Sequence, residues 1–323
     1  MLRTSAAALA LMALVVLVLL VEGATRVAYY TSSRRFVHPF LGETQKPLHQ
    51  RIDVTPEGDR FVFTTNNYGF RGADIPERKP AGARYIFALG GSTTACNEYP
   101  HEMTWPGLLE QRLRRRYGDD RIHVFNAGMG TATSYHSLVM YSNLIAELEP
   151  DLVLVYEGVN DNRAFYPSSA RYFREVGNGE DFLQRPSYLL YELALNTRST
   201  LLTRAARSLY PAALPRKGFE YHEKNYRQIA YLASGYQTPL VFITQPVIPN
   251  RRKQDGNVRE SNDRINESTR GLGQQLNVPV FDLAAVMPLD DEHFLADGVH
   301  YTKAGNATIA TKLADWLVQS GLP

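Results

Sequence analysis

Five short apolar runs limit the fold of this chain more than any other feature of its sequence. Each run has four or five residues, most of them aliphatic or aromatic, and lies near turn-forming residues, as is typical of a buried strand. Stretches with helical spacing separate the runs. The runs are residues 85–89, 122–125, 152–156, 240–243 and 278–281. Strands that alternate with helices predict an α/β domain with a doubly wound parallel sheet of about five strands.

The composition is that of a globular protein with a sizeable core. Of 323 residues, 44% are apolar and 11% are aromatic, and the formal net charge is +2. Because no basic stripe is interleaved with aromatic residues, we do not expect the chain to bind nucleic acid. Cys96 is the only cysteine, which excludes an intrachain disulfide and a zinc–thiolate site.

An uncharged segment near the N-terminus predicts a membrane helix. Residues 4–21 are dominated by Ala, Leu and Val, and at about 1.5 Å per residue they cross most of a ~30 Å hydrocarbon layer. No small-x-small cleavage site follows, so we interpret residues 1–28 as an uncleaved anchor rather than a signal peptide. More arginines follow the span than precede it, which opposes an outside domain. Long C-terminal domains are translocated largely regardless of such charges, and we expect an extracytoplasmic domain, periplasmic or at the cell surface.

The chain after the anchor divides into a stalk and a main domain. Residues 29–80 contain many turn formers and one alternating run at 60–65, which predicts a short stalk with a small β element packed on the main domain. Residues 66–72 set aromatic residues between glycines and suit a compact structural loop. The main domain covers residues 81–323. A segment rich in Tyr, Phe, Pro and Arg interrupts it at about 162–218, and we interpret this segment as a lid-like, substrate-binding insertion.

Polar or small residues follow the predicted strands. Ser92, Gly128 and Asn160 follow the first three strands, and Asp297 and His300 lie three residues apart before the last helix. Ligands and catalytic groups gather at the carboxyl ends of parallel strands, so these residues are expected to meet. Taken singly, Ser92 also fits a capping serine in a tight turn, and His300 fits a surface histidine.

Together these five residues contain the groups that acyl transfer requires. A serine hydroxyl attacks a carbonyl when a histidine removes its proton, and a carboxylate holds that histidine in the right tautomer. Ser92 is the predicted nucleophile, with His300 as base and Asp297 as its partner. The N–H groups of Ser92 and Gly128 and the side-chain amide of Asn160 are the predicted donors to the oxyanion.

Other chemistries fit the sequence less well. The acidic loop at 290–297 lacks a helical H-E-x-x-H pattern and is interpreted as solvated rather than as a metal site. The Gly90-Gly91 turn lacks both G-x-G-x-x-G and a P-loop lysine, and Cys96 suits a small packed position. We therefore expect neither a metal nor a cofactor. The Arg-Arg-Lys segment at 251–253 suits a solvated basic turn, with contact to an anionic substrate as the alternative.

Four short blocks lie between residues 84 and 317. They are Gly-Gly-Ser-Thr at 90–93, Asn-Ala-Gly-Met-Gly at 126–130, Gly-Val-Asn-Asp at 158–161 and Asp-Gly-Val-His at 297–300. In this order they resemble the blocks of the SGNH hydrolases, also called the GDSL-like lipase and acylhydrolase family. The resemblance implies a flavodoxin-like fold and the site roles given above. Gly91 stands where many members carry Asp, which leaves the chemistry intact and the substrate open. Residues 67–72 are similar to a stretch in membrane-anchored bacterial members.

The resemblance implies a membrane-anchored serine esterase or acylhydrolase that cleaves a small-molecule, carbohydrate or lipid O-acyl ester through an acyl-enzyme at Ser92. The same intermediate could pass its acyl group to a glycan hydroxyl, which would make the protein an O-acyltransferase. The sequence does not separate these two reactions because they share the acyl-enzyme. A non-catalytic binding protein with the same fold is a third hypothesis, and the intact set of five site residues argues against it.

Overall fold

The computed structural model describes residues 6–31, 36–38, 42–130, 132–163, 218–248 and 256–322. The chain divides into two units. The first contains α1 (Ala6–Thr31) and β1 (Phe36–His38), which pairs with β2 (Gly42–Thr44). Within α1, Ala8–Thr25 is long and apolar enough to cross a membrane, a test that a signal sequence would also pass. Nearly all of the insertion expected at 162–218, and the basic segment at 251–253, lie outside the described residues.

The second unit is built on a five-stranded sheet. Its strands are β5 (Arg84–Gly90), β6 (Ile122–Gly128), β7 (Leu152–Tyr156), β8 (Leu240–Ile243) and β9 (Val280–Phe281). All neighbours are parallel, and their order is β6-β5-β7-β8-β9. The chain thus extends the sheet from β5 in both directions, which places a topological switch point between β5 and β7. The predicted doubly wound parallel sheet is confirmed.

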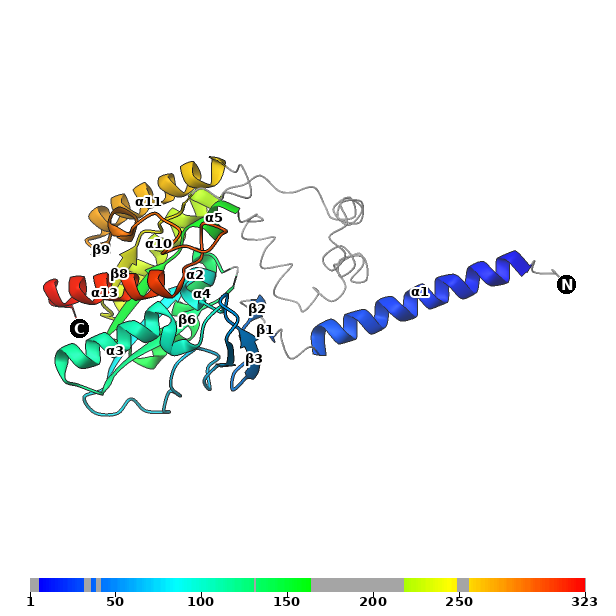
Figure 1. The fold of residues 1–323 in the computed structure, drawn as a ribbon, viewed down its shortest axis with the longest axis horizontal. Helices are drawn as coiled ribbons and strands as arrows, with labels where there is room; N and C mark the ends of the chain where they lie inside the picture. Colours follow the sequence, from blue (N-terminus) through cyan, green and yellow to red (C-terminus); the bar gives the residue numbers. More distant parts are fainter. Residues whose placement is uncertain are drawn as a thin grey trace. The chain divides into compact units, whose positions relative to one another are not determined.

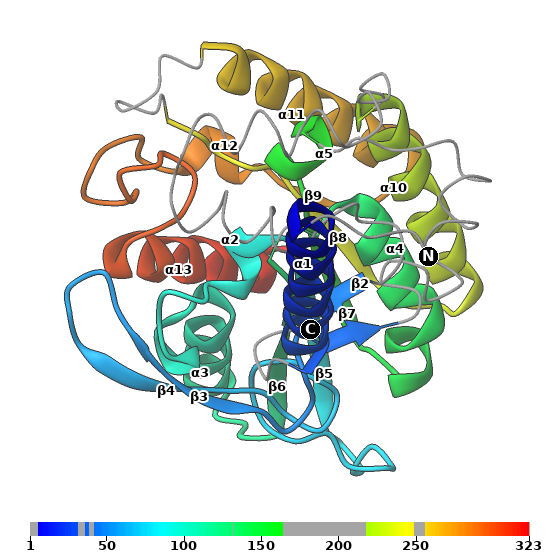
Figure 2. The ribbon, with the colours of Figure 1, turned by 90° about the vertical axis from the view of Figure 1, so that its right-hand side faces the viewer.

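Helices cover both faces of this sheet (Figures 1 and 2). On one face, α3 (Trp105–Tyr117) packs beside α13 (Lys303–Gln319), and on the other, α4 (Ser134–Asn143) packs beside α10 (Gly218–Gly235). The strands are mostly apolar because both of their faces are largely buried. The remaining described helices are α2 (Ser92–Ala95), α5 (Val159–Arg163), α11 (Gly256–Leu276), α12 (Leu283–Val286) and the 3-10 turns His101–Met103 and Ile145–Leu148.

The turn after β5 does not support the alternative that Ser92 is a capping serine. Helix α2 has only four residues, and Gly91 stands at its N-cap without a side-chain hydrogen bond. Cys96 ends this helix in a left-handed conformation with φ of 45°, which stops the helical turn. The longer helix α3 begins at Trp105, where the Thr104 hydroxyl accepts the N–H of Gly107. Ser92 is therefore not an N-cap, and Thr104 caps the longer helix after an intervening loop.

A hairpin precedes the sheet in the chain. Strands β3 (Gln50–Val54) and β4 (Arg60–Thr64) pair antiparallel, which confirms the strand predicted at 60–65. The next loop folds around Asn66, whose side-chain oxygen accepts the N–H of Tyr68 at 2.9 Å. Such a local side-chain bond replaces a backbone turn, so the loop is ordered by its own sequence.

Arg71 joins this loop to the end of α2. Its backbone forms an antiparallel bridge with Asn126 of β6, and its side chain is 1% exposed. The guanidinium donates to the carbonyl oxygens of Ala95 and Cys96 at 2.8 Å each and of Tyr99 at 2.5 Å. Burial lowers the pKa of Arg71 to about 10, so the side chain stays charged at neutral pH. The guanidinium thereby donates hydrogen bonds to carbonyl oxygens that accept no N–H group within α2.

Replacement of Arg71 by methionine should strongly destabilise the domain. Arg71→Met keeps most of the side-chain length but removes three short hydrogen bonds to buried carbonyl oxygens, at roughly 1–3 kcal/mol each before relaxation. The oxygens of Ala95 and Cys96 keep only longer bonds, of 3.4 Å from Asn126 Nδ2 and 3.2 Å from the Tyr99 N–H. We expect the free energy of unfolding to fall by about 3 kcal/mol or more, measured by urea denaturation with circular dichroism. Arg116→Met, at an exposed position of α3, is the control and should change this free energy by less than about 0.5 kcal/mol. Similar values for the two variants would contradict the role assigned to Arg71.

Candidate active site

Ser92 lies at the carboxyl end of β5, in a turn that requires two glycines. A Cβ at Gly90 would lie 2.5 Å from the carbonyl oxygen of Tyr156, and a Cβ at Gly91 would lie 2.6 Å from Asn160 Nδ2. Side chains do not tolerate such distances. The glycines therefore let the turn that carries Ser92 pack directly against the turn that carries Asn160.

Ser92, His300 and Asp297 form one continuous chain of hydrogen bonds. His300 Nε2 lies 2.8 Å from Ser92 Oγ, and His300 Nδ1 lies 2.6 Å from Asp297 Oδ2. Because a carboxylate only accepts hydrogen bonds, Nδ1 carries a proton and Nε2 is left to accept the serine proton. The His300 side chain is 24% exposed, so the ring is partly open to solvent. The structure thus brings together three residues that the sequence predicted to meet.

Asp297 is held in its ionised form. Burial raises its pKa, but hydrogen bonds from the His300 ring and from the backbone N–H groups of His300 and Val299 outweigh burial and hold the pKa well below its usual range. Both backbone bonds are 2.9 Å long and end on Oδ1, while Oδ2 faces the ring. Asp297 therefore remains a carboxylate at any pH at which the protein would be assayed.

The loop that carries this pair is anchored to the sheet and to the loop after β8. The Tyr301 hydroxyl is hydrogen-bonded to the Tyr156 hydroxyl at the end of β7. Gly298 adopts a φ of +75°, and a Cβ there would lie 2.4 Å from the carbonyl oxygen of Ile248. The loop can approach so closely only with glycine at this position. These contacts fix His300, the neighbour of Tyr301, over Ser92.

Asn160 is the second residue of α5, and its side-chain amide lies beside the turn that carries Ser92. Its Nδ2 donates one hydrogen to the carbonyl oxygen of Ala132 at 2.8 Å. An amide nitrogen carries two hydrogens, so the other is available to a ligand. The close approach of Nδ2 to Gly91 directs this group to the neighbourhood of Ser92, as the sequence predicted.

Gly128 does not fit the donor role predicted for it. Its N–H already donates to Asn126 Oδ1 at 3.0 Å. A Cβ at Gly128 would lie 2.3 Å from the backbone nitrogen of Ala95, so packing of β6 against α2 accounts for this glycine. Among the described residues, Gly130 is the next glycine along the same turn, and a Cβ there would meet nothing within 4 Å. A side chain at this position would therefore enter open space.

Two residues close to Asn160 in the chain, Glu157 and Asp161, have buried carboxyl groups. Asp161 Oδ1 accepts the N–H of Ser134 at 2.9 Å, and its Oδ2 lies 2.6 Å from His222 Nδ1. Glu157 Oε1 accepts the hydroxyl of Ser137 at 2.6 Å. Burial, and then the charge of Asp161, raise the pKa of Glu157 well above its ordinary value. Neither carboxyl group was predicted from the sequence as part of the site, although Glu157 directly follows β7, just as Ser92 follows β5.

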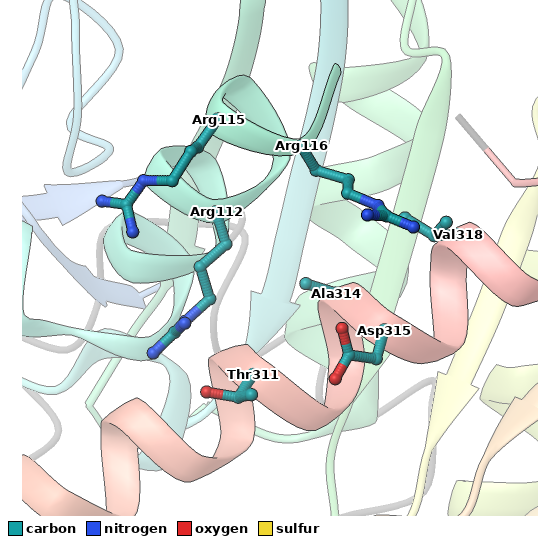
Figure 3. A pocket seen from close by; sticks show the side chains of 7 residues that line it. All are labelled: Arg112, Arg115, Arg116, Thr311, Ala314, Asp315 and Val318. Atoms are coloured by element: carbon teal, nitrogen blue, oxygen red, sulfur yellow. The ribbon is translucent and has the colours of Figure 1, made fainter. Parts of the chain in front are cut away.

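A cavity of about 350 Å³ lies elsewhere, between α3 and α13 (Figure 3). Its lining residues are Arg112, Arg115, Arg116, Thr311, Ala314, Asp315 and Val318. Both helices begin near the catalytic turns, and these residues lie in their C-terminal halves, roughly 10 Å or more along each axis at ~1.5 Å per residue. The cavity is therefore separate from the site of Ser92.

Glu157→Gln should gain stability over the parent as pH rises. Because the folded protein raises the pKa of Glu157 above 4.5, its stabilising protonated form is fully present below pH 4.5 and is lost as pH rises toward the folded value. Glutamine still accepts from Ser137 and does not ionise. We expect the Tm difference between variant and parent, measured by calorimetry, to grow in the variant's favour from pH 5 to pH 8. A Tm difference that stays constant over this range, or that moves in the parent's favour, would contradict the raised pKa of Glu157.

Comparisons with known proteins agree with the site geometry. A model of the GDSL-like lipase/acylhydrolase family matches residues 88–308, a span that includes all five predicted site residues. An arylesterase from Vibrio mimicus is 33% identical over 82 residues. This match spans 25% of the present chain and 40% of the length of the arylesterase.

Solved structures of similar fold have low sequence identity to this chain. A lipase/acylhydrolase from Enterococcus faecalis has a TM-score of 0.50 and 18% identity, covering 73% of this chain and 96% of its own. A variant of an acetyl-xylooligosaccharide esterase from Geobacillus stearothermophilus has a TM-score of 0.50 and 15% identity, covering 76% and 98%. These two likenesses concern the fold alone. Since the family model covers more than half of the chain, from residue 88 to residue 308, the chain belongs to the GDSL-like lipase/acylhydrolase family.

Proposed function

We propose that the chain is a serine esterase or acylhydrolase with Ser92 as nucleophile, His300 as general base and Asp297 as the carboxylate that orients His300. The observation that carries the proposal is the hydrogen-bond chain from Asp297 Oδ2 through the His300 ring to Ser92 Oγ, with links of 2.6 and 2.8 Å. Serine attack on an ester needs this order of groups. A non-catalytic binding protein has no use for it.

The reaction proceeds in two halves. Ser92 Oγ attacks the ester carbonyl carbon while its proton moves to His300 Nε2. The bond to the alcohol oxygen then breaks, that oxygen takes the proton from Nε2, and the acyl group stays on Ser92. A water molecule next gives a proton to Nε2 and attacks the acyl carbon. The second collapse returns the proton to Ser92 Oγ and releases the acid, while Asp297 stays ionised throughout.

The oxyanion is proposed to receive hydrogen bonds from the second N–H of the Asn160 amide and from the backbone N–H of Ser92. The N–H of Ser92 belongs to the first turn of α2, where backbone donors have no acceptor within the helix. We propose the Gly130 N–H as a third donor in place of Gly128, because the Gly128 N–H is already bonded to Asn126 Oδ1 and nothing lies within 4 Å of a Cβ built at Gly130. Neutral donors fixed in place stabilise the charge that develops on the carbonyl oxygen.

The substrate is proposed to be an O-acyl ester of a carbohydrate or lipid. Similarity to an arylesterase and to an acetyl-xylooligosaccharide esterase supports a small-molecule or glycan ester. We further propose that α1 anchors the domain to a membrane, with the domain on the extracytoplasmic side. The length and apolar character of Ala8–Thr25 support the anchor.

Ser92→Ala should abolish both hydrolysis and active-site labelling. The nucleophilic oxygen is required for the acyl-enzyme, so we expect kcat for p-nitrophenyl acetate to fall by roughly 10⁴ or more. A fluorophosphonate probe should label the parent protein and not the variant, as measured by intact-mass spectrometry. Equal labelling of the two proteins would remove Ser92 from the mechanism.

Asn160→Ala and His300→Ala should differ in their loss of kcat and in their labelling by the fluorophosphonate probe. Asn160→Ala removes one oxyanion donor and should lower kcat by about 10²- to 10³-fold with little change in KM, because the hydrogen bond strengthens in the transition state. His300→Ala removes the base, so it should cost more and also prevent fluorophosphonate labelling at neutral pH. Circular dichroism melts would control for folding. Full activity in a folded Asn160→Ala protein would contradict the proposed oxyanion hole.

A further inference from the structure

We infer that Gln245 is a positioning residue of this site, whose side-chain amide sets the spacing between Ser92 and Asn160. The inference rests on the proposed function, because it concerns the same reaction. Gln245 lies two residues beyond the end of β8 and is 2% exposed. Neither the hydrogen-bond chain of Ser92 nor the proposed oxyanion hole includes it.

The Gln245 amide bridges two separate turns. Its Oε1 accepts the backbone N–H of Val159 at 2.7 Å, and its Nε2 donates to the Thr93 hydroxyl at 3.3 Å. The orientation of the amide is determined, because a backbone N–H can only donate and must face the oxygen. Thr93 directly follows Ser92, and Val159 directly precedes Asn160. One planar group therefore connects the neighbour of the proposed nucleophile to the neighbour of the proposed oxyanion donor.

The backbone of Gln245 is itself held by α11. Asn266 Oδ1 accepts the Gln245 N–H at 2.8 Å, and Asn266 Nδ2 donates to the Gln245 carbonyl oxygen at 2.9 Å. Asn262, one helical turn earlier, donates to the same carbonyl oxygen at 2.6 Å. Helix α11 packs beside α5, at the top of the view in Figure 2. Three hydrogen bonds from α11 thus fix the backbone from which the Gln245 amide projects.

The Gln245 amide packs tightly against the backbone that leads into α5. A Cβ at Gly158 would lie 2.3 Å from Gln245 Oε1, so the amide rests directly on the backbone that leads into α5. An apolar side chain could fill this space, but it could not bond to both turns. Oxyanion stabilisation depends on donor positions to about 0.5 Å, and two directional bonds hold the turns to that tolerance better than packing alone. We therefore expect the bridge to act on kcat through Asn160.

The test compares Gln245→Met with the parent in two backgrounds. Methionine keeps the length and volume and removes both hydrogen bonds. Active sites are titrated with the fluorophosphonate probe, and kcat for p-nitrophenyl acetate is expressed per titrated site, so that misfolded protein does not count. We expect kcat to fall about 10- to 100-fold with KM changed less than about threefold. In the Asn160→Ala background, the same substitution should lower kcat by less than about threefold, because the group that it positions is gone.

Two further variants keep the inference falsifiable. Thr93→Val cuts the bridge at its other end with an isosteric side chain, and it should give a smaller loss of kcat that also disappears in the Asn160→Ala background. Thr244→Val is the control: it removes the bond of the neighbouring buried hydroxyl to Asp282, and should lower Tm while leaving kcat per titrated site unchanged. It tests whether lost stability alone affects turnover.

The outcomes separate the inference from the function on which it rests. Unchanged kcat per titrated site in both Gln245→Met and Thr93→Val would overturn the inference, as would losses of equal size with and without the Asn160 amide. In either case a labelled, active parent would leave the proposed function standing. A parent that is neither labelled nor active would instead contradict the proposed function, and the positioning role would fail with it.

Discussion

The parallel register of β5 with its two neighbours is the constraint on which the site depends. Gly90 pairs with Gly128 of β6 and with Tyr156 of β7, so three strands end at the same height. Strands in a sheet lie about 4.8 Å apart, and the turns that follow them present their groups within reach of one small ligand. The turns after β5 and β7 place Ser92 beside Asn160, and the loop before α13 adds His300 from one face of the sheet.

Directional polar contacts, more than apolar packing, hold these turns in place. Arg71 binds the carbonyl groups at the end of α2, Gln245 connects α2 to α5, and Asp161 bonds to Ser134 and to His222. Each of these polar groups is buried and would be costly if left without a partner. Each hydrogen bond restricts both a distance and an angle. Buried polar groups that all have hydrogen-bond partners therefore specify one arrangement of the turns, whereas apolar packing would allow several.

The carboxyl groups of Asp297 and Glu157 have opposite pKa shifts because their surroundings differ. Asp297 accepts hydrogen bonds from the His300 ring and from two backbone amides, which keep its pKa low and the side chain charged. Glu157 is wholly buried near the charge of Asp161, and both effects raise its pKa well above its ordinary value. A carboxyl group with a lowered pKa beside His300 and one with a raised pKa near Asn160 thus coexist within one domain. Amino-acid type alone does not assign these states.

Local patterns in the sequence determined the five strands, the parallel doubly wound sheet and four of the site positions. Apolar runs encode strands, and strand ends collect ligand groups, so Ser92, Asn160, Asp297 and His300 could be placed from the sequence alone.

The tertiary structure decided the contacts that local sequence patterns do not determine. Asp290 and His293 have the same spacing as Asp297 and His300 and form the same 2.6 Å contact, yet only the Nε2 of His300 is seen to reach Ser92. The occupied N–H of Gly128 and the bridge from Gln245 to Thr93 and Val159 likewise depend on atoms far apart in the chain. Hydrogen bonds act over about 3 Å, and only the folded packing brings such partners within that distance.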